Sequence, residues 1–474
     1  MKVDPKTSDS KDGLANRFGP AGAGVVVVVV VGGTGGATHP LARTSIPAAP
    51  IPDASRNFLR VDVAAAASLV AIELPRHIET KDLSLSLSLV ANARSLVRQT
   101  PTFGPRPEQS ERPERGIRGI APSTPITVRR MDNPKFRVLL EPKDEYPHEP
   151  EDVSNYNESM YLNVFDADNE IGGWFRIGNR VNEGYAEMTV CVYLPGGRIG
   201  FIYGRPRISS NDAMDAGGLR IDVVTPFEQL TVTYEGKVCL LDDPRQMADP
   251  RKAFAENPML HCSVHLDVRG ISPMYGGRPV NADGSDLEVQ AEKSFAKAHY
   301  EQHTAVTGTI TVGDEVIQID GLGLRDKSWG PRYWQAVHWY RWLPFVFGPD
   351  FAMMLSIIGG EDPTVPPRQS GMVLENGNYS LIRECTIESD WDEDNYQTGM
   401  RCWLRTDDKE YEVTGEVISL IPLRNRRTTE DGEQLVTRIT EAMTRYRCGD
   451  RTGIGMSEYL DQIRDGVPVG PDVN

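Results

Sequence analysis

Apolar and polar residues alternate in short segments from Ser159 onward, and turns rich in Gly and Pro separate these segments. The clearest alternation covers residues 261–268, where apolar side chains occupy the even positions and polar side chains the odd ones. Pro195-Gly-Gly197 joins two further segments, 184–194 and 198–203, in the manner of a hairpin turn. A period of two residues is typical of strands with one buried face. The sequence therefore predicts an all-β protein, either a sandwich or a barrel.

The pattern also divides the chain into two β units. Helical periodicity is limited to two short stretches, 249–257 and 288–298. Residues 270–286 are rich in Gly and Pro, so we place a boundary there, with a first domain at 131–285 and a second at 286–474. Beyond this boundary, strands are expected at residues 299–312, 315–322, 351–358, 371–375, 379–388, 400–406, 410–418 and 437–447.

Residues 1–130 differ in composition from the rest of the chain. They hold 17 Lys and Arg against 11 Asp and Glu, and they lack Tyr, Trp and Cys altogether. A segment so poor in large apolar side chains cannot bury enough surface to offset the entropy of ordering it, so we expect disorder. The seven valines of Val25–Val31 are far short of the roughly 20 residues of a membrane span, and no span is expected.

Two explanations of this segment compete. Met131 is the true start and the upstream sequence a misassigned reading frame, which we favour, or the segment is a genuine disordered or targeting extension. An intact-mass measurement on the native protein decides between them.

Residues 131–474 are strongly acidic, with 34 Lys and Arg against 56 Asp and Glu. This charge repels phosphate backbones and anionic lipid, so nucleic acid and membrane surfaces are not expected partners. All six cysteines lie in this region, none paired at a metal-binding or redox spacing. We interpret them as small buried side chains in a reducing compartment, which favours the cytoplasm.

The densest group of reactive and aromatic residues spans 321–334, Gly-Leu-Gly-Leu-Arg-Asp-Lys-Ser-Trp-Gly-Pro-Arg-Tyr-Trp. Trp339 and Trp342 follow, so four of the seven tryptophans fall within 14 residues. Such a concentration of aromatic rings must be covered by protein or by ligand. One interpretation is structural: a loop plugs a barrel end, and Asp326 pairs with an arginine such as Arg332.

The second interpretation is catalytic. A carboxyl group in an aromatic wall has a raised pKa and holds a proton, and aromatic faces stabilise cations. Asp326 could then protonate an alkene and the rings could shelter the carbocation. Arg325 and Lys327 oppose this by favouring the carboxylate, but in an extended segment both side chains point to the face opposite Asp326.

The string G-x-G-x-R-D-x-S-W-G-x-R-x-W resembles the signature of the lipocalin-like superfamily that includes carotenoid 1,2-hydratase (hydroxyneurosporene synthase). The resemblance to an uncharacterised bacterial branch of it extends over roughly 131–474. It implies two tandem lipocalin-like antiparallel β-barrels or sandwiches that handle an apolar, often isoprenoid, substrate, and a proton-donating aspartate at Asp326. Lys327 departs from the usual Asp-His-Ser-Trp pattern and leaves the activity open. The branch resemblance rests also on residues 178–187, 215–220, 234–239, 299–303 and 453–458.

A second motif is His299-Tyr-Glu-Gln-His303, in which a strand would place His299, Glu301 and His303 on one face. These side chains suit a divalent metal, a general base pair, or a polar face without metal, and we predict no metal site. Glu187 is a further candidate cavity carboxylate. Arg176, Asn179, Arg180 and Asn182 crowd a turn, which we interpret as a solvated loop rather than an anion site.

The sequence favours an enzyme that acts on an apolar ligand by proton transfer, as a hydratase, isomerase or cyclase. No phosphate cradle or Gly-x-Ser-x-Gly elbow occurs, and no cofactor is expected. A non-catalytic lipid or terpenoid carrier and a structural β-protein without a cavity are the alternatives, and the oligomeric state is left open. The predicted catalytic residues are Asp326, His299, Glu301 and His303, and the predicted ligand-binding residues are Trp329, Tyr333, Trp334, Tyr300 and Arg332.

Overall fold

A computed structural model describes residues 136–288, 294–362, 364–428, 432 and 434–470 of the chain. The expectations of disorder for residues 1–130 and of a start at Met131 lie outside the described residues. Within the described ranges, no helix is long and apolar enough to cross a bilayer.

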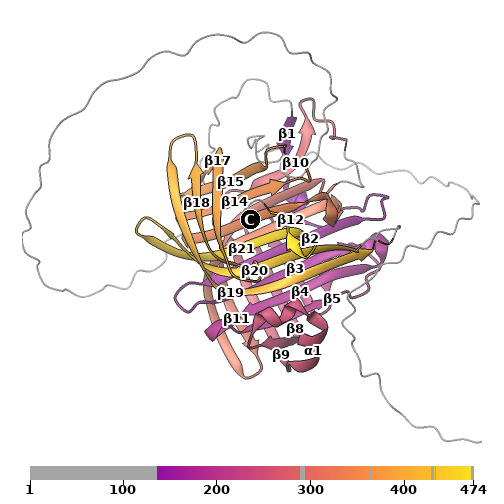
Figure 1. Ribbon diagram of the computed structural model, residues 1–474. Coiled ribbons are helices and arrows are strands. Elements are labelled where there is room, and N and C mark those ends of the chain that lie inside the picture. Colours follow the sequence, from indigo (N-terminus) through magenta and orange to yellow (C-terminus); the bar gives the residue numbers. More distant parts are fainter. Residues whose placement is uncertain (1–135, 289–293, 363, 429–431, 433, 471–474) are drawn as a thin grey trace, which may run out of the picture. The chain divides into compact units, whose positions relative to one another are not determined.

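The described residues form two large antiparallel sheets, which confirms the all-β prediction (Figure 1). The first sheet contains β1 (Phe136–Leu139), β2 (Tyr156–Asp166), β3 (Ile171–Arg180), β4 (Tyr185–Tyr193), β5 (Ile199–Gly204), β6 (Met214–Ala216), β7 (Leu219–Thr225), β8 (Gln229–Leu241), β9 (Met259–Gly270), β10 (Tyr275–Asn281), β11 (Ala298–Val312) and β12 (Glu315–Pro331). The second contains β13 (Trp339–Gly348), β14 (Phe351–Gly359), β15 (Arg368–Glu375), β16 (Asn378–Leu381), β17 (Glu384–Trp391), β18 (Gln397–Arg405), β19 (Glu410–Thr428), β20 (Gln434–Cys448), β21 (Arg451–Arg464) and β22 (Val467–Pro468).

Helices are short and few among the described residues. The predicted helix at 249–257 is confirmed as α1 (Pro250–Glu256), where Asp249 caps the first turn by accepting a hydrogen bond from the Lys252 amide. The helix predicted at 288–298 falls partly on residues 289–293, which lie outside the described part of the chain. Residues 294–297 form no helix, and β11 begins at Ala298.

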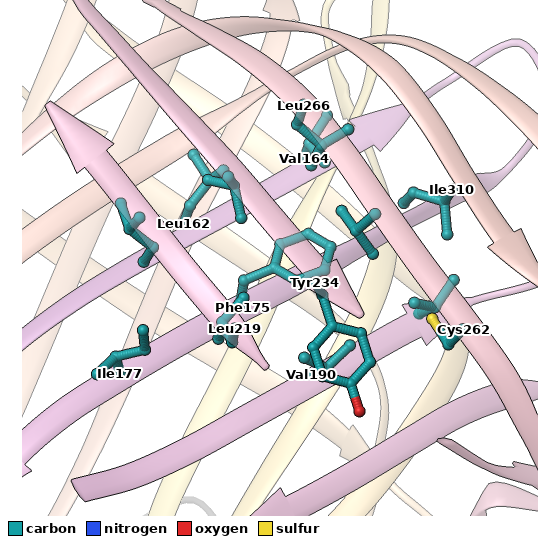
Figure 2. Close-up of a cluster of buried hydrophobic side chains, with 14 of the residues drawn as sticks. Leu162, Val164, Phe175, Ile177, Val190, Leu219, Tyr234, Cys262, Leu266 and Ile310 are labelled. Atoms are coloured by element: carbon teal, nitrogen blue, oxygen red, sulfur yellow. The ribbon is translucent and has the colours of Figure 1, made fainter. Parts of the chain in front are cut away.

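Eight strands of the first sheet close into a ring, because β9 pairs with both β8 and β11. The circuit runs β2, β3, β4, β5, β8, β9, β11 and β12. Apolar side chains fill its interior, among them Leu162, Phe175 and Val190, none more than 1% exposed (Figure 2). The interior of the ring is therefore occupied by its own core.

The second sheet curves around a core of its own. Met353 of β14 and Val373 of β15 share one apolar cluster with Cys402 of β18, although β18 lies far from β14 and β15 in the strand order. Because side chains alternate along a strand, the residues between these positions face the other way, toward the first sheet.

The two sheets meet through the outer face of the ring and the outer face of the curved sheet. Phe165, Trp174 and Tyr193 from the ring share a cluster with Met443 and Met456 from the second sheet. The division of the chain at 285/286 stays a prediction, but β10 and β11 on either side of that point pair within one sheet. The strands change sheets later, between β12 and β13, so the 321–334 motif begins in the first sheet.

β12 continues beyond the predicted strand end at residue 322 and carries most of the motif. Arg325 and Lys327 of this strand point to the end of the ring, where Arg325 donates to both carboxylate oxygens of Glu145, at 2.6 and 2.9 Å. Lys327 Nζ lies 2.5 Å from Glu158 Oε1 and also donates to two backbone carbonyls. These buried ion pairs give Arg325 and Lys327 a structural role away from Asp326.

Removal of one partner from a buried ion pair leaves the other charge uncompensated. We expect Arg325→Met to lower the free energy of unfolding by about 3–5 kcal/mol, because Glu145 is 0% exposed. Arg198→Met, which breaks an exposed pair with Glu315, is the matched control and should cost less than about 1 kcal/mol. Urea unfolding of both variants checks this, and equal effects would show that the Arg325 pair is not structural.

Candidate functional site

A pocket of about 300 Å³ lies between the outer faces of the two sheets. Its wall contains side chains from the ring strands, from α1 and from the second sheet. Ten of the lining residues are aromatic: Tyr161, Trp174, Phe201, Tyr203, Phe254, Tyr275, Phe295, Trp334, Tyr340 and Trp342. Such a wall suits an apolar or aromatic ligand.

Strand alternation explains how charged side chains reach this pocket. On β12, Asp326 and Ser328 line the pocket, whereas Arg325 and Lys327 point into the end of the ring. Asp326 therefore faces away from its two basic neighbours, the arrangement expected of an extended segment. On β11, His299 and Glu301 line the pocket for the same reason.

Asp326, His299 and Glu301 form a compact group. Glu301 and Asp326 are directly paired across β11 and β12. His299 Nε2 lies 3.5 Å from Asp326 Oδ2 and 3.7 Å from Glu301 Oε1. Burial disfavours the imidazolium, but the hydrogen bond to Asp326 and the charge of Glu301 outweigh it and raise the pKa of His299.

Glu301 is a buried carboxyl group with incomplete hydrogen bonding. It is 1% exposed, its Oε1 accepts a hydrogen bond from Trp342 Nε1 at 2.9 Å, and its Oε2 has no partner. Burial raises its pKa to about 7, and Asp326 adds to the shift, while His299 and the Trp342 hydrogen bond act against it. Glu301 therefore exchanges a proton near neutral pH.

A second carboxyl pair lies on the opposite wall. Glu441 of β20 and Glu458 of β21 are cross-strand neighbours, and the Tyr340 hydroxyl donates to Glu458. Burial and mutual repulsion raise the pKa of Glu441 well above its usual range, and burial also raises that of Glu458. We refer to Asp326, Glu301, Glu441 and Glu458 as the acidic cluster.

Three arginines line the pocket near Glu187, and we refer to Arg176, Arg205 and Arg332 as the arginine end. Arg176 Nη1 and Arg205 Nη2 lie 3.3 and 3.5 Å from the two carboxylate oxygens of Glu187. The arginines outweigh burial and lower the pKa of Glu187. The prediction of a cavity carboxylate at Glu187 is confirmed. The interpretation of Arg176 as part of a solvated turn is wrong, because β3 extends through it to Arg180.

The structure brings only some of the predicted ligand-binding residues to the pocket. Arg332 and Trp334 line it, and the Arg332 guanidinium donates to Ser328 Oγ and the Phe295 carbonyl. Tyr300 and Trp329 lie on the other face of their strands, where Tyr300 donates to Glu145 and Trp329 stacks on His148. Tyr333 is half-buried and lies outside the pocket lining.

His303 occupies a different environment from the other predicted catalytic residues. It is 0% exposed, with Nε2 3.3 Å from the Met353 carbonyl and Nδ1 3.1 Å from the Tyr379 hydroxyl, and it lies outside the pocket lining. Burial lowers its pKa to about 4, so its ring is neutral near pH 7. His303 joins the two sheets and makes its hydrogen bonds outside the pocket lining.

Sequence reasoning missed Glu441, Glu458 and Tyr340 as pocket residues. One signal was available: a carboxyl residue shares a strand face with a buried apolar side chain. Glu458 is an example, since it lies two residues from the buried Met456 on β21. Within the part of the chain that the structure describes, no group of three or more His, Cys, Asp or Glu side chains is arranged to hold a metal ion.

The raised pKa of Glu301 has a measurable effect on stability. Between about pH 4.5 and 7 the folded protein keeps a proton that the unfolded chain releases, so Glu301 lowers stability as the pH rises through this range. Glu301→Gln cannot ionise. Relative to wild type, its free energy of unfolding should increase by on the order of 3 kcal/mol from about pH 5 to about pH 8.

Denaturant unfolding at several pH values measures this difference. Glu315→Gln is the matched control: its hydrogen bond to Arg198 lowers the pKa of the exposed Glu315, so no change is expected in the same pH range. A Glu301→Gln difference that stays constant with pH would contradict a buried carboxyl group that titrates near neutrality.

No curated protein matches this sequence. Solved structures with distant similarity include a putative AttH from Nitrosomonas europaea, with 12% identity, coverage of 68% of this chain and 96% of that chain, and a TM-score of 0.45. Kievitone hydratase from Nectria haematococca has 8% identity, coverage of 68% and 93%, and a TM-score of 0.41. CghA with Sch210972 has 11% identity, coverage of 69% and 99%, and a TM-score of 0.41.

One family model covers most of the folded region. It matches residues 141–463, from the turn before β2 to the end of β21, and thus includes both sheets and the residues of the acidic cluster. The chain belongs to the family described as a domain of unknown function, DUF7064.

Proposed function

We propose that the protein is an enzyme that transfers a proton to or from carbon on a small, largely apolar ligand, as a hydratase, isomerase or cyclase. The observation that carries this proposal is the position of Asp326, His299 and Glu301 together on the wall of an aromatic pocket. Proton transfer needs an acid or base within reach of the ligand and a pKa near the working pH. Asp326 meets the first requirement because it faces the pocket, and Glu301, with a pKa of about 7, brings a group that meets the second requirement to the same site.

Asp326 is the residue that meets the ligand in this proposal. Its side chain is 22% exposed and faces the pocket, whereas Glu301 is almost fully covered. His299 contacts both carboxyl groups and connects Asp326 to Glu301, the carboxyl group that exchanges protons near neutral pH. The same ring nitrogen, Nε2, faces both carboxyl groups. After Asp326 gives its proton to the ligand, the protonated imidazole returns a proton to Asp326 from Nε2 and then takes one from Glu301 at the same atom.

The aromatic wall has its own part in the reaction. Trp342 donates to Glu301 and also lines the pocket, and Trp334 lies on the same wall as Arg332. Aromatic faces stabilise positive charge, so the Trp342 ring, which lies beside Glu301, stabilises a cation that forms when an alkene is protonated. The resemblance of the 321–334 motif to carotenoid 1,2-hydratase supports the same class of reaction, with Asp326 as the acid.

The experiment starts from the ligand that the protein itself selects. Organic extraction of the purified protein, followed by mass spectrometry, identifies bound apolar compounds, which are then incubated with the protein in D₂O. Proton transfer to carbon places solvent deuterium in a C–H bond of the ligand. Asp326→Asn should slow this incorporation by at least about a hundredfold, since a positioned general acid contributes roughly that much or more, and leave ligand affinity largely unchanged.

Asp320→Asn is the matched control, because Asp320 lies on the same face of β12 but is exposed and outside the pocket lining. It should incorporate deuterium at the wild-type rate. A wild-type protein that retains its ligand for hours without deuterium incorporation would instead favour the carrier function.

A further inference from the structure

The arginine end holds more positive charge than its neighbours neutralise. Arg176 and Arg205 share a single carboxylate, Glu187, at 3.3 and 3.5 Å, which are long distances for ion pairs. Arg332 is 6% exposed, and its hydrogen bonds go to a hydroxyl and a carbonyl, both uncharged. Three guanidinium groups therefore share Glu187 and the nearby charge of Asp326, so positive charge remains in excess at this end of the pocket.

Arg176 and Arg332 also lie against the same ring. Their Cζ atoms are 5.9 and 5.3 Å from the centre of the Trp334 indole. Arg176 Nη2 and Trp334 Nε1 are both buried without a hydrogen-bond partner, although both residues line the pocket. Burial and the charge of Arg176 together lower the pKa of Arg332 to about 9. Like charges and unpaired donors are costly in a buried site unless a bound group compensates them.

Asp326 of the acidic cluster supplies part of that compensation, because its charge acts on Arg332. Glu301, Glu441 and Glu458 all have raised pKa values, so these groups tend to keep their protons and remain uncharged near neutral pH. The pocket thus combines a proton-holding side with a side that carries unbalanced positive charge. Arg424 and Arg426 add two exposed arginines at the pocket wall, on β19, where they favour the approach of an anion.

We propose that the arginine end binds a carboxylate, or an equivalent planar oxyanion, of the ligand, so that the substrate is an apolar acid. Guanidinium groups match the two oxygens of such an anion with paired hydrogen bonds. Trp174, Phe201 and Phe254 line the same pocket and offer a surface for the apolar body. The inference rests on the proposed function, and it adds the chemical class of the substrate and the residues that hold it.

The test uses two probes of nearly equal shape, naphthaleneacetate and naphthaleneacetamide, which differ in charge. Binding is measured by calorimetry and by quenching of tryptophan fluorescence near neutral pH. Wild-type protein should bind the acetate about ten- to a hundredfold more tightly than the amide, since hydrogen bonds between charged groups are the stronger ones. Arg332→Met and, separately, Arg176→Met should remove most of this preference and leave the affinity for the amide within about twofold.

Arg220→Met is the matched control, because Arg220 is exposed on β7, pairs with Asp215 and Asp222, and lies outside the pocket lining. It should keep the full preference for the acetate. Having two arginine variants protects the test if one of them fails to fold, which thermal unfolding would reveal. Equal affinity of wild type for both probes would overturn the inference and leave the proton-transfer proposal standing. Failure of both probes to bind would overturn the apolar pocket on which both proposals rest.

Discussion

The central physical constraint in this protein is the cost of placing ionisable side chains under cover between two sheets. Burial penalises charge unless a partner compensates it. At the end of the ring, Arg325 with Glu145 and Lys327 with Glu158 meet this cost by forming close ion pairs. In the pocket the cost is met differently: Glu301, Glu441 and Glu458 tend to keep their protons, whereas the arginines share the charges of Glu187 and Asp326.

The fold creates this situation by filling two cores separately. The ring of eight strands packs its own interior, and the curved sheet packs its concave core, so the remaining outer faces meet each other. Strand alternation then sends every second side chain to the meeting surface. Aromatic side chains from both sheets line the pocket at that surface, and the acidic cluster and the arginine end lie among them. The same geometry provides a site for proton transfer and a site for an anion.

Much of the architecture and part of the site follow from the sequence alone. The alternating segments predict the strands. The period of two residues also predicts that His299 and Glu301 share one strand face, and both line the pocket with Asp326. The position of the pocket did not follow, because a closed ring suggests an internal cavity and nothing local indicates that Leu162 and Phe175 fill it. His303 shares the face of Glu301 in sequence terms, yet its contact with Met353 depends on the second sheet.

Long-range pairing explains the other differences. Glu441 and Glu458 become neighbours only when β20 and β21 pair, and their approach to Asp326 depends on how the two sheets meet. The sequence did not predict the arginine end for a similar reason. Arg176 lies near residues that suggest a turn, but the pairing of β3 with β2 and β4 keeps the chain extended beyond Arg176.

The proposed chemistry depends most directly on carboxylic acids that remain protonated near neutral pH inside the pocket. Infrared difference spectroscopy detects the carbonyl stretch of a protonated carboxyl group and can follow it as the pH is raised. Wild-type protein is expected to keep this band at about pH 7, and Glu441→Gln should weaken it, because burial and the charge of Glu458 raise the pKa of Glu441 well above its usual range. Complete loss of the band by about pH 5.5, where ordinary carboxyl groups are already ionised, would contradict the proposed chemistry.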